Sequence, residues 1–262
     1  MRIPMIVTIL RREWVELLRN PLLLATIVGP PIVLTVAPLA VGGFVRGEPM
    51  PAELVEQLRR VRPDWSGLAN DDLALAYGFQ QFLLFFLMMP AFIPLSIATF
   101  SIIGEKQSRS LEAVLATPVR TSELLTGKAL AALTPGLLGG GLAYAAFVVL
   151  VGVLFGPVLQ GIVAGADWLA AVILLGPTIG LLAIVLGIIV SARVSDPRTA
   201  QQVGAIIVVP LVAATIAQAT GAFAIGPVGY AIAAAVTLAV ALIGLRVAVS
   251  VFGRESILTR WR

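Results

Sequence analysis

Residues 129–155 read ALAALTPGLLGGGLAYAAFVVLVGVLF and contain no charged side chain. A helix needs about 20 mostly apolar residues to cross the hydrocarbon core of a bilayer, so this stretch is long enough to span one. Further stretches of the chain meet the same condition, and Arg246 is the one charged residue among them. They lie at residues 22–45, 78–103, 168–192, 203–223 and 228–249. The sequence therefore predicts an all-α polytopic membrane protein with six transmembrane helices, forming a single domain over residues 1–262.

The composition supports the same prediction. Of the 262 residues, 59% are hydrophobic and 12% are charged, and the mean hydropathy is +1.01. Soluble proteins carry about 25% charged residues, so this chain has too few charges to cover a surface that faces water. The sequence also has no cysteine and no histidine. That excludes disulfides, Cys/His zinc sites and the commonest general base, so we expect no catalytic residue, cofactor or metal on this chain.

The basic residues lie at the ends of the apolar spans and predict the orientation of the chain. If the N-terminus is cytoplasmic, the outer side holds Arg46, Arg59, Arg60 and Arg62. The remaining Lys and Arg residues then lie inside, at positions 2, 11, 12, 19, 106, 109, 120, 128, 193, 198, 246, 254, 260 and 262. By the positive-inside rule, both termini are cytoplasmic in a multi-pass protein of the plasma membrane. This placement also argues against a nucleic-acid partner, despite the net charge of +4.

Residues 1–20 predict an amphipathic helix that lies in the membrane interface. The apolar residues Ile3, Val7, Leu10, Trp14 and Leu17 recur at steps of three and four, which places them on one helical face. An indole such as that of Trp14 is suited to the headgroup region. The alternative is a cytosolic helix that packs on a partner protein.

Residues 46–77 form the one sizeable loop expected on the outer side. A short helix is predicted from Pro51 to Arg62, because Pro51 suits a first turn and Pro63 ends the segment. Asn70 or Asp71 is expected to cap the helix that becomes the second span.

The stretch GEKQSRSLEAVLATPVRTSELLTGK, residues 104–128, is a polar connection between the second and third spans. It predicts two short helices with a turn between them. Ser110 can cap the first helix, and Thr117-Pro118 ends it. Thr121 or Ser122 can cap the second, which leads into the third span. Such an elbow, continuous with two spans, is suited to receive force from a peripheral partner.

This stretch resembles the signature of ABC type-2 exporter permeases, whose usual form is E-(K/R)-x-x-x-(T/S)-L-E-x-L-L-x-(T/S)-P-(V/L)-x-x-x-(E/Q)-(L/I)-(L/I)-x-(G/S)-K. Supporting similarities are Arg12-Glu13 and Arg19-Asn20-Pro21 near the N-terminus, SDPR at 195–198 and FGRE at 252–255. The short link at 221–227 departs from relatives that carry re-entrant helices there, which leaves the substrate class open.

The resemblance implies that two six-helix permease subunits, identical or different, pair in membrane lipid and sit on two copies of a separate ATPase subunit. ATP and Mg would bind to the ATPase. Residues 1–20 would be the connecting helix, and residues 104–128 would be the coupling region that docks in a groove of the ATPase. Carried onto this sequence, the coupling residues are Glu105, Lys106, Ser110, Leu111, Glu112, Leu115, Thr117, Pro118, Glu123 and Lys128.

The apolar spans also exclude other classes of membrane protein. Ion-coupled carriers usually need ionisable residues within the membrane, and these spans have none away from their ends. No phosphate-binding GxxxxGK[ST] loop is present, so energy for uphill transport must come from a partner. The leading interpretation is the permease subunit of an ATP-driven exporter. The alternatives are a passive channel or lipid scramblase without a motor, and a scaffold that recruits a cytosolic protein. The substrate stays open among hydrophobic drugs, lipids or lipid-linked molecules, polymers and sodium, with small hydrophobic compounds favoured.

Overall fold

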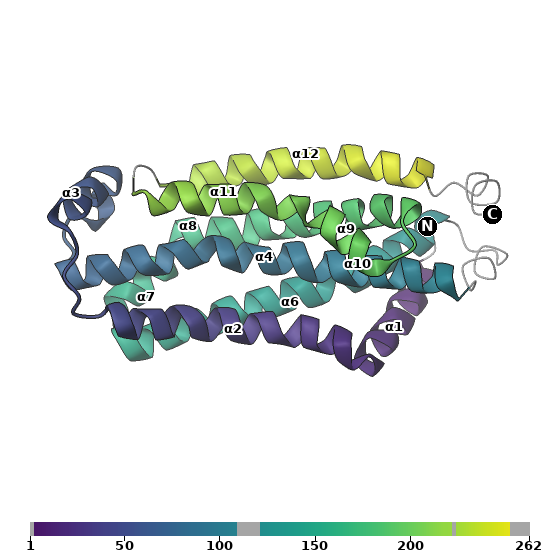
Figure 1. Cartoon of the computed structure of the whole chain (residues 1–262), viewed down its shortest axis with the longest axis horizontal. Coiled ribbons are helices and arrows are strands. Elements are labelled where there is room, and N and C mark those ends of the chain that lie inside the picture. Colours follow the sequence, from purple (N-terminus) through teal and green to yellow (C-terminus); the bar gives the residue numbers. More distant parts are fainter. Residues whose placement is uncertain (1–2, 109–120, 222–223, 252–262) are drawn as a thin grey trace.

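The computed structural model describes residues 3–108, 121–221 and 224–251, and every regular element in this part of the chain is helical. Six of its helical segments are long and apolar enough to cross a membrane, as the sequence predicted. They run side by side along the long axis of the molecule (Figure 1). In chain order, the elements are α1 (Ile3–Arg19), α2 (Pro21–Val45), α3 (Ala52–Val61), η1 (Pro63–Trp65), α4 (Asn70–Gln107), α6 (Thr121–Phe155), α7 (Pro157–Val163), α8 (Ala166–Leu169), η2 (Ala170–Leu175), α9 (Gly176–Arg193), α10 (Pro197–Gly204), η3 (Ala205–Ile207), α11 (Val208–Ala219) and α12 (Pro227–Val251).

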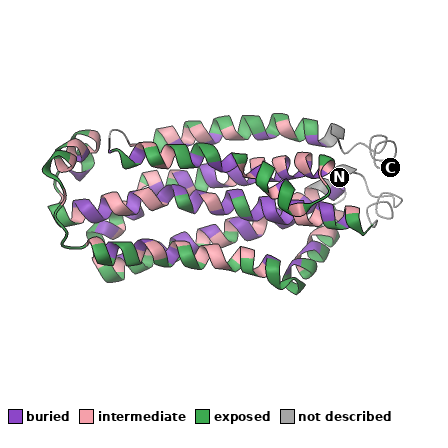
Figure 2. Cartoon of the chain, in the orientation of Figure 1, coloured by how far each residue is buried: buried purple, intermediate pink, exposed green. Residues whose placement is uncertain are grey.

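Helix α4 is the centre of the bundle. It packs against α9, α6, α2 and α11, and 78% of the residues in its most apolar 18-residue stretch are buried. The corresponding share is 17% in both α2 and α12, whose outward faces carry exposed Val, Ile and Leu side chains. Figure 2 shows this contrast along the two outer helices. Because exposed aliphatic side chains are stable in hydrocarbon and not in water, α2 and α12 are suited to face lipid.

An aromatic cluster joins α4, α6 and α8 in the half of the bundle next to α3. The ring of Trp168 stacks on Tyr144 at 5.8 Å and on Phe147 at 5.5 Å, and Phe86 packs edge-on to it at 5.9 Å. The Trp168 indole N–H donates to Oε1 of Gln80 at 3.2 Å. A buried indole needs such a partner, because an unpaired donor in hydrocarbon costs several kcal/mol, on the order of 2–7.

Two of the spans are less regular than the sequence predicted. The fourth includes a π-helical segment, η2, directly before Pro177. Proline cannot donate to the carbonyl four residues earlier, and the wider turn accommodates that carbonyl. The fifth span begins at α10 rather than at residue 203, and α11 ends at Ala219 rather than at 223. It ends there because Gly221 takes a positive φ of 68°, which stops a right-handed helix.

The loop between α2 and α4 forms a small cap over one end of the bundle. As predicted, a short helix, α3, lies within residues 51–62 and buries Leu58. The guanidinium of Arg62 forms an ion pair with Asp167 of α8, and the Tyr77 hydroxyl donates to the Ala219 carbonyl at 2.6 Å. The predicted side-chain cap at Asn70 or Asp71 is wrong. Ala69 occupies the N-cap position, and the Asn70 side chain accepts instead from Nη2 of Arg59 at 3.2 Å.

At the opposite end of the bundle, α1 crosses the ends of the spans at a steep angle to α2 (Figure 1). It packs against α6 and α2. Asn20 separates α1 from α2, and its side-chain oxygen accepts from the amides of Leu22 and Leu23. Pro21 then occupies the first turn of α2, where a missing N–H costs nothing. The Arg19-Asn20-Pro21 sequence therefore redirects the chain from a crossing helix into a span.

Candidate functional site

The structure describes four of the predicted coupling residues. Glu105 and Lys106 lie in the last turn of α4, and Glu123 and Lys128 lie in the first turns of α6. Glu123 is completely buried. The other predicted residues lie outside the described residues; they are Ser110, Leu111, Glu112, Leu115, Thr117 and Pro118. The proposed caps at Thr121 and Ser122 stand at the edge of that part, so the structure does not test them.

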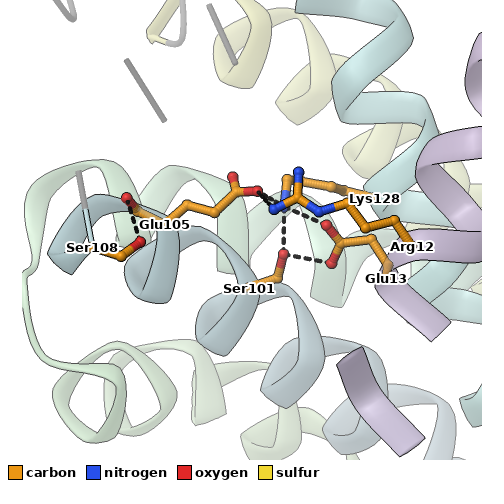
Figure 3. Close-up of polar contacts among 6 residues, drawn as sticks. All are labelled: Arg12, Glu13, Ser101, Glu105, Ser108 and Lys128. Atoms are coloured by element: carbon orange, nitrogen blue, oxygen red, sulfur yellow. Dashed lines mark hydrogen bonds and ion pairs between the residues drawn. The ribbon is translucent and has the colours of Figure 1, made fainter. Parts of the chain in front are cut away.

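Glu105 and Lys128 meet in an ionic cluster that joins three helices. We define the ionic cluster as Arg12 and Glu13 of α1, Ser101 and Glu105 of α4, and Lys128 of α6 (Figure 3). The ammonium of Lys128 lies 2.7 Å from Oε1 of Glu13, 3.1 Å from Oε1 of Glu105 and 2.5 Å from Oγ of Ser101. The Ser101 hydroxyl donates to Oε2 of Glu13 at 2.7 Å. Arg12 lies over the same site, with Nη2 3.7 Å from Oε1 of Glu105.

Burial makes this cluster energetically important. Glu13, Glu105 and Lys128 are 5%, 7% and 6% exposed. A buried ammonium has three N–H donors to satisfy, and here it has three acceptors within hydrogen-bonding reach. Removing one partner from a buried ion pair typically costs about 3–5 kcal/mol, because the other charge is left without compensation. The cluster therefore fixes the positions of α1, α4 and α6 relative to one another.

Local helix geometry brings these side chains together. Ser101 and Glu105 are four residues apart on α4, so they share one face and point towards α1 and α6. On α1, Glu13 and Leu17 are the two buried residues and are also four apart. Leu10, Glu13 and Leu17 thus occupy one side of α1, with the carboxylate among the apolar residues. In the sequence, Glu13 stands out only through the family likeness of Arg12-Glu13, and nothing marks Ser101 as a partner. A carboxylate on the apolar face of an amphipathic helix was the signal for a buried cation partner.

Lys106 is not part of the cluster and points to a different neighbour. Its ammonium donates to the Val194 carbonyl at 3.4 Å, and Nε2 of Gln107 donates to the Ser195 carbonyl at 2.9 Å. These bonds connect the last turn of α4 to the link between α9 and α10. The C-terminal end of α4 is therefore held on two sides.

The link itself is shaped by Asp196, the N-cap of α10. Its Oδ2 accepts from the Thr199 amide at 2.8 Å and from the Thr199 hydroxyl at 2.9 Å. These two bonds hold the pKa of the Asp196 carboxyl below its ordinary value of 3.8. Pro197 follows at the first helical position. The SDPR sequence is thus a helix start, and the carbonyls of Ser195 and of the preceding Val194 accept from α4.

The ionic cluster connects three helices. In residues 3–108, 121–221 and 224–251, no group of three or more acidic, His or Cys side chains could hold a metal ion. Within the ionic cluster, the Lys128 ammonium contacts both carboxylates, and both oxygens of Glu13 are bonded. The cluster lies near the end of α4 and the start of α6, the two helices that flank residues 109–120 in the sequence.

Comparison with known proteins identifies the family. Residues 49–224 match the sequence profile described as "ABC-2 family transporter protein". This range covers α3 to α11 and contains both the 104–128 connection and the two α4 and α6 residues of the predicted coupling set that meet in the cluster. Searches among curated proteins and among solved structures gave no significant match. Since the profile covers well over half of the chain, this multi-pass membrane protein belongs to the ABC-2 family of transporter proteins.

Proposed function

We propose that this chain is the permease subunit of an exporter driven by ATP hydrolysis on a separate ATPase. The observation that carries the proposal is the ionic cluster. It ties the helix that enters the 104–128 connection and the helix that leaves it to each other and to α1. A force applied to the connection would then move α4, α6 and α1 together, because their ends cannot separate without breaking buried ion pairs.

The proposed mechanism needs a stiff path from the connection to the centre of the bundle. Helix α4 provides it, since it runs unbroken over 38 residues and is the most buried span. Closure of two ATPase subunits would push on residues 109–120, and the ionic cluster would keep the ends of α4 and α6 from yielding locally. Lys106 and Gln107 would pass the same displacement to the α9–α10 link.

The remaining partners follow from the same proposal. ATP and Mg bind to the ATPase and not to this chain. A second permease subunit, a copy of this chain or a different one, completes the pathway. Both termini are cytoplasmic, so the ionic cluster faces the ATPase in the plasma membrane and α1 lies in the interface as a connecting helix. The apolar spans suit small hydrophobic compounds as substrates.

The test is to capture the tagged full chain from its native membrane in mild detergent and identify its partners by mass spectrometry. We expect a stoichiometric soluble protein with a phosphate-binding loop of the GxxxxGK[ST] type. Recovery of the chain alone, under conditions that keep other membrane complexes intact, would contradict the proposal. Flux through the purified chain in liposomes without nucleotide would then support a channel or scramblase. Partner binding with no flux would support a scaffold.

A point substitution sharpens this test. In the first short helix predicted within the 104–128 connection, Leu111, Val114 and Leu115 share one apolar face, and Leu111→Asp places a charge on that face and should abolish capture of the ATPase. Ala113→Asp is the matched control, because residue 113 lies on the opposite face of that predicted helix. Both variants should insert and unfold as the unsubstituted chain does. Equal loss of the ATPase from both variants would show that the apolar face is not what the ATPase recognises.

A further inference from the structure

An apolar groove of about 580 Å³ runs between α2 and α6 and meets α1 at one end. Val28 and Pro31 of α2 and Leu142 and Ala146 of α6 line it, and Trp14 lies at the α1 end. The polar groups nearest to it are already bonded. The Trp14 indole donates to Oγ1 of Thr134 at 3.2 Å, and the hydroxyl of Thr35, which also lines the groove, donates to the Pro31 carbonyl at 2.8 Å. The groove wall therefore makes only apolar contacts with a molecule that binds in it.

The length of the groove corresponds to one leaflet of a bilayer. Its α2 wall extends from Leu24 to Val36, which is about 18 Å at 1.5 Å per residue. Half of a typical hydrocarbon core is about 15 Å. The groove thus starts at the end of the spans where α1 crosses and reaches the middle of the membrane.

The volume favours a thin occupant over a helix. A helix about 10–12 Å in diameter occupies roughly 1,400 Å³ over 18 Å, more than twice the volume of the groove. An entire helix of a second copy of this chain therefore exceeds the groove and would have to lie over it rather than in it. A single extended hydrocarbon chain has the required cross-section.

The α1 end of the groove carries a positive charge. Arg11 lies three residues before Trp14 and seven before Leu18, both of which line the groove, so all three share one side of α1. Arg11 is exposed and forms no ion pair with any other residue that the structure describes. Arg12 instead faces the ionic cluster, 3.7 Å from Glu105. Arg11 is thus placed to meet an anion above an apolar slot.

We propose that this groove binds one acyl chain of an anionic phospholipid from the leaflet at the α1 end, with the lipid phosphate paired to Arg11. Trp14 lies between the charge and the slot, at the depth where an amphipathic ring is stable. The inference uses the membrane location of the chain and does not depend on the ATPase or on the direction of transport.

The test measures lipid retention by native mass spectrometry of the purified full chain, loaded with equal amounts of phosphatidylglycerol and phosphatidylcholine of identical chains. We expect one phosphatidylglycerol per chain at the lowest loading. Ala146→Phe places a ring in the mid-membrane end of the groove and should strongly reduce this adduct. Ala145→Phe is the control, because Ala145 is exposed and does not line the groove.

Arg11→Gln should lower the preference for phosphatidylglycerol about five-fold. Arg46→Gln removes one exposed charge at the other end of the bundle and should not lower it.

Several results would overturn the proposal. Equal retention of the two lipids by the unsubstituted chain would show that the headgroup is not recognised. Retention by Ala146→Phe equal to that by Ala145→Phe would place the lipid elsewhere. An unchanged preference in Arg11→Gln would remove Arg11 from the site. Conversion of a dimer to monomers by Ala146→Phe, with lipid retention unchanged, would identify the groove as an interface between copies of this chain.

Discussion

Lys128 shows how a charge can be stable at the base of an apolar bundle. Its ammonium is 6% exposed and lies within 3.1 Å of two carboxylate oxygens and one hydroxyl. Glu13 in turn accepts from Ser101, so its second oxygen is also bonded. With Arg12 included, two cations face two carboxylates. This balance lets a lysine lie among apolar helices without the penalty of an isolated buried charge.

Removing that lysine should destabilise the protein strongly. We expect Lys128→Met to lower the free energy of unfolding by about 3–5 kcal/mol, because Glu13 and Glu105 lose the cation between them. The measurement is an unfolding titration in detergent. Lys106→Met is the matched control, with a smaller expected loss, because the Lys106 ammonium lies outside the ionic cluster. Equal losses in the two variants would contradict the role given to the cluster.

Asp196 allows a prediction about pH. Because the folded pKa of its carboxyl is depressed by Thr199, ionised Asp196 stabilises the start of α10 above the ordinary pKa of 3.8. The stabilisation is lost as the pH falls below 3.8 and through the folded pKa. Hydrogen exchange of the α10 amides should therefore accelerate, relative to the intrinsic rate, as the pH is lowered from 5 to 3. Asp196→Asn, which can cap without titrating, should remove this dependence. A dependence that persists in Asp196→Asn would assign it to another group.

At the scale of elements, close contact between α4 and α6 depends on a missing side chain. A Cβ atom on Gly136 of α6 would lie 2.8 Å from the ring of Pro94 in α4, closer than two carbon atoms can pack. A proline ring cannot rotate out of the way, so the helices themselves would have to separate. Gly141 of the same helix has no such neighbour within 4 Å of its hypothetical Cβ. The two glycines therefore have different roles, although the sequence alone presents them alike.

Alanine substitutions should separate these roles. Gly136→Ala should destabilise the protein by about 1–3 kcal/mol, the usual cost of overpacking a close contact. Gly141→Ala should leave stability unchanged or slightly raise it, since alanine favours helix over glycine. Thermal unfolding of both variants in one detergent provides the comparison. A stable Gly136→Ala variant would mean that α4 and α6 can move apart at little cost.

At the scale of the whole molecule, the two ends of the bundle differ in construction. The α3 end is closed by a loop whose Arg62 forms an ion pair with α8 and whose Gln57 donates to the Thr220 carbonyl after α11, and Tyr77 of α4 donates to the Ala219 carbonyl beside it. The other end carries α1 across the spans and the ionic cluster beneath it (Figures 1 and 3). In the function proposed above, the cross-linked end would receive the force and the capped end would release the cargo.

The absence of cysteine from the sequence makes the orientation directly testable. Single cysteines at exposed Ser66, in the α3 end, and exposed Ser195, in the α9–α10 link, should react differently with a membrane-impermeant maleimide. We expect Ser66→Cys to be labelled in intact cells and Ser195→Cys only after the membrane is opened. Labelling in the reverse order would invert the topology and place the ionic cluster away from a cytoplasmic ATPase.

The six spans, the family and the short helix α3 could be predicted from the amino-acid sequence. These depend on local composition and on the 104–128 signature, and both can be read without knowing which residues meet. The side-chain partners could not be predicted, because they depend on helices that are distant in the sequence and adjacent only in the folded chain. In the folded chain, Glu13 and Lys128, which are 115 residues apart, lie 2.7 Å from each other. Lys106 donates to the Val194 carbonyl outside the ionic cluster, and the Asn70 side chain accepts from Arg59 instead of capping a helix. These outcomes follow from how three helices pack, because a buried charge is stable only where another element supplies its counter-charge.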